Sequence, residues 1–528
     1  MKILKASEMA YADENTIKLT GIPSLVLMEN AGRTASQIIL ERYPDKKYFV
    51  VVAGSGNNGG DGLVIARYLL RYNRDVKVFI LSDSRQKLSQ DNLKNLEIFE
   101  SFGGEVLFIN KENTGKIRNP VKEADVVIDA IFGTGFKPPV KGFREKVIQI
   151  INRYAKNVVA VDIPSGLSTD TGRIEGVHTR ADLTVTFAYP KPAHILYPAC
   201  ELCGEVFVVD ISIDDSYLKE IHRYLLTYES IKLPERKKNS HKYTYGHLLV
   251  VGGSVGKTGA VIMASRSATA SGSGLVTAVV PGSLDQVFEN ALTEEMTIPV
   301  DDIDGYFGKK AYRQIKEIIK NGKFTSVVAG MGMSVTENCI SVIDQLLKGK
   351  MPLVIDADGI NNLVLVDNFK EKLKKRKHPT VLTPHIGEMS RLTGLKTKEI
   401  LDSMEETALS FSKETGSFVI LKGSRTVIST PDGKVYYSIK GNEGMATAGT
   451  GDILSGITGT LVFRLGAEEG VKTAVYLHGL SGDLAVKETG VESMKATDLI
   501  RFIPEAYREI KRMKERKDTG FYRTLSSV

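Results

Sequence analysis

Short, valine-rich runs alternate with longer amphipathic segments along most of this 528-residue chain. Runs such as YFVVVAG, ADVVIDAIFG and NVVAVDIP are bounded by Gly or Pro, and stretches with a helical period lie between many of them. Such an alternation is typical of a mostly parallel sheet that is covered by helices. The pattern therefore predicts an α/β fold.

The alternation occurs in two successive series. The first ends with GEVFVVDI, and a stretch before it, SLVLMENAGRTASQIILERY, predicts a long helix. The second starts near Tyr245 with GHLLVVGG and ends in mainly helical sequence from Gly451 to about Lys514. The stretch between the two series is polar and charged, with no strong core pattern. We therefore predict a domain over residues 1–215, a linker over 216–232, a second domain over 233–512 and a loosely held tail over 513–528.

Charge and cysteine content exclude several classes of protein. The net charge of +7 is mild for this length, and the basic runs PERKKNS and KEKLKKRKHP are typical of a linker and a solvated helix end, so we expect no nucleic-acid binding. Cys200 and Cys203 form one CxxC, but no second pair completes a zinc site. The N-terminus lacks the apolar region of a signal peptide, and no apolar run of about 20 residues suggests a membrane span. We expect a soluble, cytoplasmic protein.

The stretch HLLVVGGSVGKTGAV, which begins at His247, looks like a phosphate-binding P-loop. That motif needs a glycine five positions before Gly256, where this chain has Val251. Gly252 leaves one residue too few between itself and Gly256. We therefore interpret the stretch as a glycine-rich turn from a strand to a helix.

The stretch AGSGNNGGDG follows the first strand of the first series. Its five glycines, Gly54 to Gly62, let the backbone turn sharply and approach a ligand closely. The start of the following helix favours a phosphate or another anion. Asn57, Asn58 and Asp61 add side-chain oxygens that suit a hard cation or a ribose. The alternative is a purely structural turn.

Two further strands of this series end in aspartate. Asp129 ends VVID and Asp162 follows VVAV, and glycines come shortly after both. Ligands of open α/β sheets bind outside the carboxyl ends of the strands. Asp162 is therefore our candidate for proton exchange with a substrate, and Asp129, Asn58 and Ser165 are candidates for holding a cation.

The motifs GSGNNGGDG, DAIFGTG and VDIPSGL, in that order, resemble the NAD(P)H-hydrate epimerase family over roughly residues 1 to 215. The resemblance implies a Rossmann-like three-layer α/β/α sandwich and a potassium ion held by Asn58, Asp129 and Ser165. It also implies that the hydrated nucleotide contacts Asn57, Asn58, Gly59, Gly60, Asp61, Gly133, Thr134, Gly135, Phe136, Lys137, Pro138, Pro139 and Asp162.

Near the end of the second series, AGTGD precedes the apolar helix ILSGITGTLVFRL. Gly449 and Gly451 free the backbone amides to converge on an anion at the helix N-terminus. Asp452 stands in the first turn, where a carboxylate suits the removal of a hydroxyl proton during phosphoryl transfer. The alternative is a simple helix cap.

Four upstream motifs complete this second group of polar strand ends. VIDADGINNL carries Asp356 and Asp358, LTPHIGEM carries His385 and Glu388, LKGSRTVI forms a turn between two strands, and VVAGMGMS supplies glycines. VIDADGINNL, LTPHIGEM, LKGSRTVI and AGTGDILSG, in that order, resemble the ADP-dependent NAD(P)H-hydrate dehydratases of the ribokinase-like superfamily over about residues 233 to 512. The second domain is therefore expected to be a ribokinase-like α/β domain.

This second resemblance implies a role for two sets of residues. Those near the hydrate would be Ala260, Gly332, His385 and Asp452. Those binding the nucleotide would be Lys422, Gly423, Ser424, Arg425, Thr426, Asn442, Glu443, Gly444, Met445, Ala446, Thr447, Ala448, Gly449, Thr450 and Gly451.

Together the two resemblances imply a metabolite-repair enzyme that epimerises R and S NAD(P)H hydrates (NADHX and NADPHX) and dehydrates the S-epimer with ADP. The implied cofactors are K⁺ in the first domain and Mg²⁺ with ADP in the second. Two alternatives stay open. In the first, the second domain is a small-molecule kinase that keeps its phosphorylated product. In the other, the first domain is a non-catalytic nucleotide-binding module. Apolar helical surface near the N-terminus also suggests a homo-oligomer.

Overall fold

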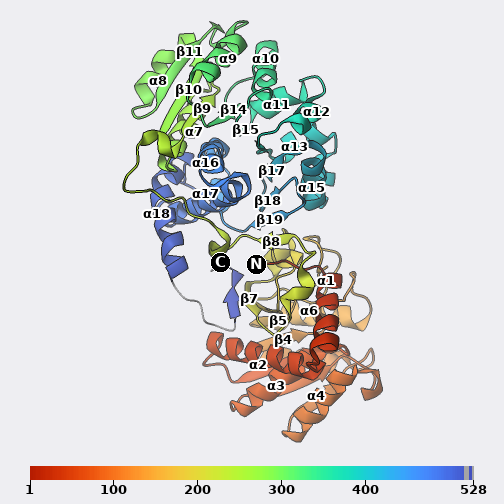
Figure 1. The fold of residues 1–528 in the computed structure, drawn as a ribbon. Coiled ribbons are helices and arrows are strands. Elements are labelled where there is room, and N and C mark those ends of the chain that lie inside the picture. The colour runs from red at the N-terminus through yellow and green to blue at the C-terminus, as the bar shows by residue number, and fades with distance from the viewer. Residues whose placement is uncertain (516–521, 526–528) are drawn as a thin grey trace. The chain divides into compact units, whose positions relative to one another are not determined.

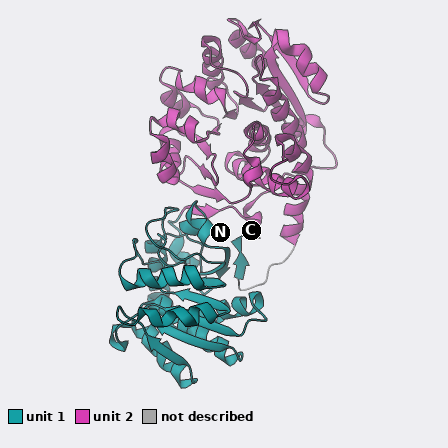
Figure 2. Cartoon of the chain, turned by 180° about the vertical axis from the view of Figure 1, so that it is seen from behind, with its two compact units in different colours: residues 1–221, 518–528 teal, residues 222–517 magenta. Residues whose placement is uncertain are grey.

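A computed structural model describes residues 1–515 and 522–525 of the chain (Figure 1). The chain divides into two compact units, coloured separately in Figure 2. Unit 1 consists of residues 1–221 and 518–528, and unit 2 of residues 222–517. The division lies inside the stretch that we predicted to be a linker.

The described part of unit 1 contains one eight-stranded sheet, in which the strands pair in parallel except at the edge between β20 and β7. The predicted mostly parallel α/β arrangement is confirmed for this unit. In spatial order the strands are β20 (Tyr522–Thr524), β7 (Glu205–Val209), β6 (Leu183–Phe187), β5 (Val158–Val161), β4 (Val126–Ala130), β1 (Tyr48–Ala53), β2 (Asp75–Ile80) and β3 (Glu105–Phe108).

Helices cover both faces of this sheet, because successive side chains of a strand point to opposite faces. Phe49 and Val51 of β1 pack with α2, α3 and α4, whereas Val50 and Val52 pack with α5 and α6. The three-layer sandwich predicted for this half of the chain is therefore present. The long helix predicted around SLVLMENAGRTASQIILERY is also confirmed, as α2. The helices are α1 (Ala6–Asn15), α2 (Ser24–Arg42), α3 (Asn57–Arg71), α4 (Gln90–Ser101), α5 (Arg118–Glu123) and α6 (Phe143–Tyr154).

The described residues of unit 2 form a ten-stranded sheet, and most of its strands are parallel. β18 pairs antiparallel with both of its neighbours, β17 and β19. In spatial order the strands are β11 (Met296–Val300), β10 (Leu275–Pro281), β9 (His247–Val251), β14 (Ser326–Ala329), β15 (Leu353–Ile355), β16 (Thr380–Leu382), β17 (Phe418–Leu421), β18 (Thr426–Ser429), β19 (Val435–Ser438) and β8 (Arg223–Leu225); β12 (Asp302–Ile303) and β13 (Tyr306–Phe307) form a separate hairpin.

A layer of four helices, α7, α16, α17 and α18, packs on one face of this sheet, and most of the other helices lie on the opposite side (Figure 1). Apolar side chains of β9, such as Leu248 and Val250, form the core with α16 and α17. The helices are α7 (Thr258–Ala270), α8 (Asp285–Ala291), α9 (Ala311–Asn321), α10 (Glu337–Leu347), α11 (Asp358–Val364), α12 (Phe369–Lys375), α13 (Ile386–Thr393), α14 (Thr397–Asp402), α15 (Met404–Thr415), α16 (Thr450–Leu465), α17 (Ala467–Thr489) and α18 (Ala496–Glu515).

Two expectations about irregular segments are wrong. The stretch 216–232 does contribute to a core, since β8 lies at the edge of the sheet of unit 2 and Leu226 and Ile231 are buried. A three-residue strand is too short to show an alternating pattern among charged neighbours. The tail is partly fixed as well, because β20 pairs with β7 and Leu525 is buried. The remaining tail residues, 516–521 and 526–528, lie outside the described part of the chain. Within residues 1–515 and 522–525, no helix is long and apolar enough to cross a membrane.

Candidate active sites

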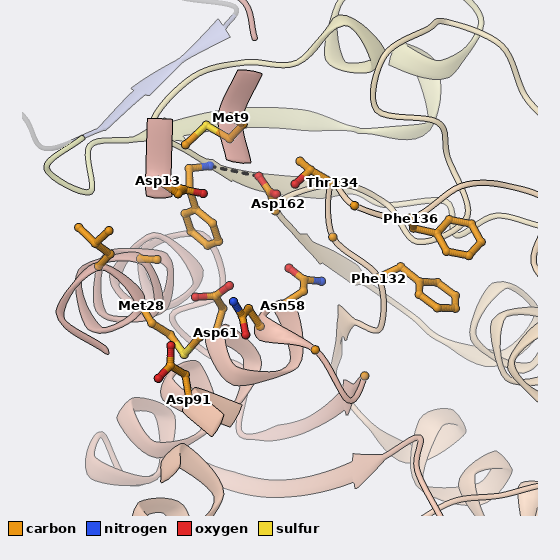
Figure 3. Close-up of a pocket in the computed structure, with 18 of the residues that line it drawn as sticks. Met9, Asp13, Met28, Asn58, Asp61, Asp91, Phe132, Thr134, Phe136 and Asp162 are labelled. Carbon is orange, nitrogen blue, oxygen red and sulfur yellow. Dashed lines mark hydrogen bonds between the residues drawn. The ribbon is translucent and has the colours of Figure 1, made fainter. Parts of the chain in front are cut away.

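A cavity of about 600 Å³ opens at the carboxyl edge of the sheet of unit 1 (Figure 3). It lies where the chain leaves β1, whose neighbours β4 and β2 lie on opposite sides of it. A reversal of strand order at this point leaves a crevice between the loops, which is where ligands bind in open α/β sheets. The predicted site residues that line the cavity are Asn57, Asn58, Asp61, Gly133, Thr134, Gly135, Phe136 and Asp162.

Other predicted contacts do not line this cavity. Gly59 and Gly60 are buried in α3, and the segment from Lys137 to Pro139 continues the loop beyond Phe136. Their assignments as substrate contacts stay predictions.

The glycine-rich stretch differs from the predicted loop, because α3 already begins at Asn57. Its first turn therefore carries Asn57, Asn58 and Asp61 to the cavity. Close backbone packing explains the glycines: a Cβ at Gly54 would stand 2.0 Å from the carbonyl oxygen of Ile131. The buried Asn92 of α4 fixes the turn, since its Nδ2 donates to the carbonyls of Gly54 at 3.0 Å and Gly56 at 2.7 Å.

Two of the three residues predicted to hold a cation, Asp129 and Ser165, contact each other, and the third, Asn58, lines the cavity. The Asp129 carboxylate is fully buried and accepts hydrogen bonds from the Ser165 hydroxyl at 2.6 Å and the Ser165 backbone N–H at 2.8 Å. The Asn58 side chain is buried, and neither its oxygen nor its nitrogen has a hydrogen-bond partner among the described residues. A Cβ at Gly133 would stand 3.5 Å from Asn58 Oδ1, which places this loop beside the amide. An unsatisfied amide oxygen, a carboxylate and a hydroxyl are the kinds of oxygen donor that suit a hard cation.

Asp162 directly follows β5 in a left-handed backbone conformation, with φ of 65°. Such a conformation is uncommon for a residue with a side chain and often marks a functional position. Its Oδ1 accepts hydrogen bonds from Lys191 Nζ at 2.5 Å and from Thr186 Oγ1 at 2.9 Å. Burial alone would raise the pKa of Asp162, but the ammonium of Lys191 outweighs it and lowers that pKa. Asp162 is therefore a carboxylate held ionised at the wall of the cavity.

Sequence reasoning missed several residues of this site. Lys191 is fully buried and lies in the segment YPKPAH after β6, where a lone lysine between prolines carries no recognisable signal. Asp13 and Met9 line the cavity from α1, far from every glycine-rich motif. The one available signal was the spacing of Met9 and Asp13, which are four residues apart and therefore lie on one face of helix α1.

In unit 2, a buried ion pair connects two of the predicted strand ends. Lys422 follows β17 and its Nζ donates to Asp356 Oδ1 at 2.7 Å, while Ser455 of α16 donates to Asp356 Oδ2 at 2.7 Å. Asp356 is 1% exposed. Burial opposes both charges, but each partner outweighs it, so the pKa of Asp356 is lowered and that of Lys422 is raised. The pair therefore holds the Lys422 ammonium and the Asp356 carboxylate together beside α16.

Asp452 lies in the first turn of α16, as predicted. Gly449 precedes the helix with φ of 98°, and a Cβ at Gly451 would stand 3.3 Å from Lys422 Nζ. The helix N-terminus and the lysine thus face the same region, which favours a negatively charged group there. Burial, followed by the nearby charge of Asp356, raises the pKa of Asp452 to about 7. A carboxyl group poised near neutral pH suits a general base.

Two predicted hydrate contacts lie next to each other: Ala260 in the first turn of α7 and Gly332 in the loop after β14. A Cβ at Gly332 would stand 3.3 Å from the Cβ of Ala260 and 2.5 Å from the carbonyl oxygen of Lys257. Lys257 Nζ donates to Asp358 Oδ2 at 3.0 Å, so the stretch that looks like a P-loop contributes a lysine to this region. It forms the predicted turn between β9 and α7.

His385 caps α13, because its Nδ1 accepts hydrogen bonds from the backbone N–H groups of Gly387 at 2.9 Å and Glu388 at 3.2 Å. The backbone of His385 also bridges to Lys422. Burial and the charge of Lys422 lower the pKa of His385, so the ring is neutral near pH 7. His385 therefore has a structural role as a cap and still lies beside the Lys422–Asp356 pair.

The predicted nucleotide residues form two segments of unit 2. The first, Lys422–Thr426, comprises the turn between the antiparallel strands β17 and β18 and the first residue of β18. The second leads into α16 and is held by Asp483 of α17, which accepts hydrogen bonds from the Gly441 backbone N–H at 3.1 Å and Asn442 Nδ2 at 3.2 Å. Much of this second segment, such as Glu443 and Thr447, is exposed. It is therefore open to a ligand.

Comparison with known proteins agrees with both halves of the chain. Residues 24–193 match the family described as YjeF-related protein N-terminus, and residues 248–505 match NAD(P)H-hydrate dehydratase. Among solved structures, the ADP/ATP-dependent NAD(P)H-hydrate dehydratase from Bacillus subtilis, co-crystallised with ATP and Mg²⁺, is 28% identical. The match has a TM-score of 0.48 and covers 54% of this chain and 98% of that one.

Two curated relatives match along almost their entire length. The bifunctional NAD(P)H-hydrate repair enzyme Nnr of Thermofilum pendens is 37% identical over 522 residues, and that of Moorella thermoacetica is 38% identical over 522 residues. Each alignment covers 97% of this chain and 97% of the relative. The chain therefore belongs to the family of bifunctional NAD(P)H-hydrate repair enzymes.

Proposed function

We propose that unit 1 interconverts the R and S epimers of NADH and NADPH hydrates, and that unit 2 dehydrates the S-epimer with ADP as phosphoryl donor, releasing AMP and phosphate. One observation carries this proposal. Each unit places a carboxyl group with a shifted pKa at the ligand-binding edge of its sheet, Asp162 in unit 1 and Asp452 in unit 2. Shifted pKa values at such an edge are a mark of acid–base chemistry.

In the epimerase site, the hydrate enters the cavity of unit 1 with its reduced nicotinamide ring facing Asp162. The hydroxyl at C6 of that ring must leave and return on the opposite face. Asn58, Asp129 and Ser165 would hold K⁺, which would supply a fixed positive charge at this site. Asp162, kept ionised by Lys191, is the acid–base group of this site.

In the dehydratase site, Asp452 removes the proton of the C6 hydroxyl, and the oxygen attacks the β-phosphoryl group of ADP. Backbone N–H groups from Gly449 to Gly451 and the Lys422 ammonium stabilise the charge on the transferring group. The nitrogen of the ring then expels phosphate from C6, and loss of a C5 proton restores NADH or NADPH. Within residues 1–515 and 522–525, no cluster of three His, Cys, Asp or Glu side chains forms a metal site. This fits Mg²⁺ that is held mainly by the nucleotide phosphates and water.

The products distinguish this function from the kinase alternative. We would incubate the protein with S-NADHX, Mg²⁺ and either ADP or ATP, and follow phosphorus species by ³¹P NMR together with nicotinamide absorbance at 340 nm. Stoichiometric release of AMP, phosphate and NADH from ADP supports the dehydratase. Accumulation of a stable phosphate ester without return of NADH contradicts it and favours a small-molecule kinase.

The pH dependence of dehydration follows from the raised pKa of Asp452. Only the ionised carboxylate accepts the hydroxyl proton, so kcat is expected to rise about tenfold per pH unit below about pH 7 and to level off above it. Steady-state rates with S-NADHX and saturating ADP between pH 5.5 and 8.5 measure this. A flat profile across the range would remove Asp452 from the proton-transfer step.

We also propose that the enzyme acts in the cytoplasm as a homo-oligomer, on small molecules and without nucleic acid. Support for self-association comes from unit 1, where Leu19 and Val26 are 66% and 45% exposed between α1 and the start of α2. Size-exclusion chromatography with light scattering gives the oligomeric state directly.

A further inference from the structure

We propose that Asp13, on helix α1, is a second proton-transfer residue of the epimerase site and acts as the acid partner of Asp162. The inference rests on the proposed epimerase function of unit 1 and extends it to a part of the chain outside the motifs that indicated that function. It assigns a chemical role to the N-terminal helix.

Helix α1 is fixed by the fold of unit 1. Met9 and Ala12 are buried against Leu4 and Leu218. The N-terminus of α1 is tied to a distant loop, since the backbone N–H of Ala6 donates to Asp170 Oδ1 at 2.6 Å. The face of α1 that carries Asp13 is therefore held at the wall of the cavity, and Figure 3 shows Asp13, Asp61 and Asp162 arranged around the same space.

The surroundings of Asp13 differ from those of Asp162. Asp162 accepts hydrogen bonds from Lys191 and Thr186, whereas the Asp13 carboxyl group has no hydrogen bond or salt bridge among the described residues. A carboxyl group without such partners, in a site shaped for a ligand, is free to bond to that ligand. The charged groups that face it are Asp162 and Lys191, and Asp61, Asp91 and Arg144 also line the cavity.

These surroundings shift the pKa values of the two carboxyl groups in opposite directions. Burial, followed by repulsion from Asp162, raises the pKa of Asp13 to about 6 although Lys191 opposes the shift. The hydrogen-bonded ammonium of Lys191 lowers the pKa of Asp162. Two carboxyl groups whose surroundings drive their pKa values apart are the arrangement by which one acts as acid and the other as base.

The reaction balances with these two groups alone. Neutral Asp13 gives its proton to the C6 hydroxyl, the C6–O bond breaks, and the lone pair of the ring nitrogen forms a C6=N1 iminium as water leaves. A water molecule then adds to the opposite face of C6 and gives its proton to the Asp162 carboxylate. The product is the other epimer, and one water is lost for each water gained. The reverse reaction runs with Asp162 as acid and Asp13 as base, so the active enzyme carries one proton on the pair.

The test compares Asp13→Asn with Glu14→Gln, a neighbouring change at an exposed residue that pairs with Lys18. Interconversion of purified R- and S-NADHX is followed by chromatography without nucleotide, at pH 5 to 8. We expect Asp13→Asn to lower the epimerisation rate by roughly 100-fold or more, as for loss of a general acid. Asp13→Glu should recover part of that rate. In every variant the dehydration of S-NADHX with ADP should match the wild type, which makes unit 2 an internal control.

The wild-type pH profile is an independent measurement that does not depend on a variant folding. The epimerisation rate should fall about tenfold per pH unit above about pH 6, as Asp13 loses its proton. A flat profile from pH 5 to 8, or an Asp13→Asn enzyme as fast as Glu14→Gln, would overturn the role of Asp13. If the wild type itself shows no epimerisation above the spontaneous rate, the proposed function of unit 1 fails instead.

Discussion

Replacing Asp452 by asparagine is expected to lower the kcat of S-NADHX dehydration by roughly 100- to 10,000-fold, the usual range for loss of a general base. The amide keeps the size of the side chain but has no basic oxygen for the C6 hydroxyl proton. The KM for ADP should change little, because the proposed nucleotide contacts are the backbone around Gly449 and Lys422, which this change leaves in place. Single-turnover absorbance measurements at saturating ADP separate the chemical step from binding.

The control for this variant is Asp432→Asn, at a residue between β18 and β19 whose side chain is 59% exposed and pairs with Lys434. It should retain the wild-type rate. Epimerisation should be the same in Asp452→Asn, Asp432→Asn and wild type, since unit 1 is unchanged. If the kcat of Asp452→Asn lies within threefold of the control, Asp452 does not act as the general base and has only a structural place in the first turn of α16.

Replacing Asp162 by asparagine is expected to lower the epimerisation rate by roughly 100- to 10,000-fold, because the site then lacks its ionised carboxylate. The same change leaves Lys191, fully buried, without its counter-charge. Breaking a buried ion pair in this way typically costs about 3–5 kcal/mol of unfolding free energy. We therefore expect both a slower epimerase and an earlier unfolding transition of unit 1, measured by chromatography of the epimers and by circular dichroism during heating.

Two comparisons separate these effects. Asp83→Asn alters an exposed residue of unit 1 that pairs with Lys87, and it should change neither property. The double variant Asp162→Asn with Lys191→Met removes the unpaired charge, so it should regain stability without regaining epimerase activity. Normal epimerisation by Asp162→Asn at a temperature where unit 1 is folded would remove Asp162 from the chemistry.

The strand ends that form both sites were predictable from the sequence, because glycines and aspartates after valine-rich runs are a local signal. Asp129 lies near the end of β4, Asp162 and Asp356 directly follow β5 and β15, and Asp452 lies at a helix N-terminus. The start of α3 at Asn57 was missed, since glycines are poor helix formers and their close packing on Ile131 and Asn92 is a tertiary effect.

The partners of those residues were not predictable in the same way. Lys191 and Asp13 reach the cavity through tertiary contacts that bring β6 and α1 to the loop after β1, and no motif records such contacts. The pairing of Lys422 with Asp356 likewise joins residues that are 66 positions apart. The edge strands β8 and β20 were missed because three-residue strands carry too few side chains to show a period.

The most direct test of both proposed activities is the recovery of NADH from an equimolar mixture of R- and S-NADHX, with K⁺, Mg²⁺ and ADP. We expect complete recovery, faster than spontaneous epimerisation, with Asp162→Asn stopping near the S-epimer share and Asp452→Asn recovering almost none. Wild-type recovery that stops at the S-epimer share would contradict the epimerase of unit 1, and no recovery with either ADP or ATP would contradict the dehydratase of unit 2.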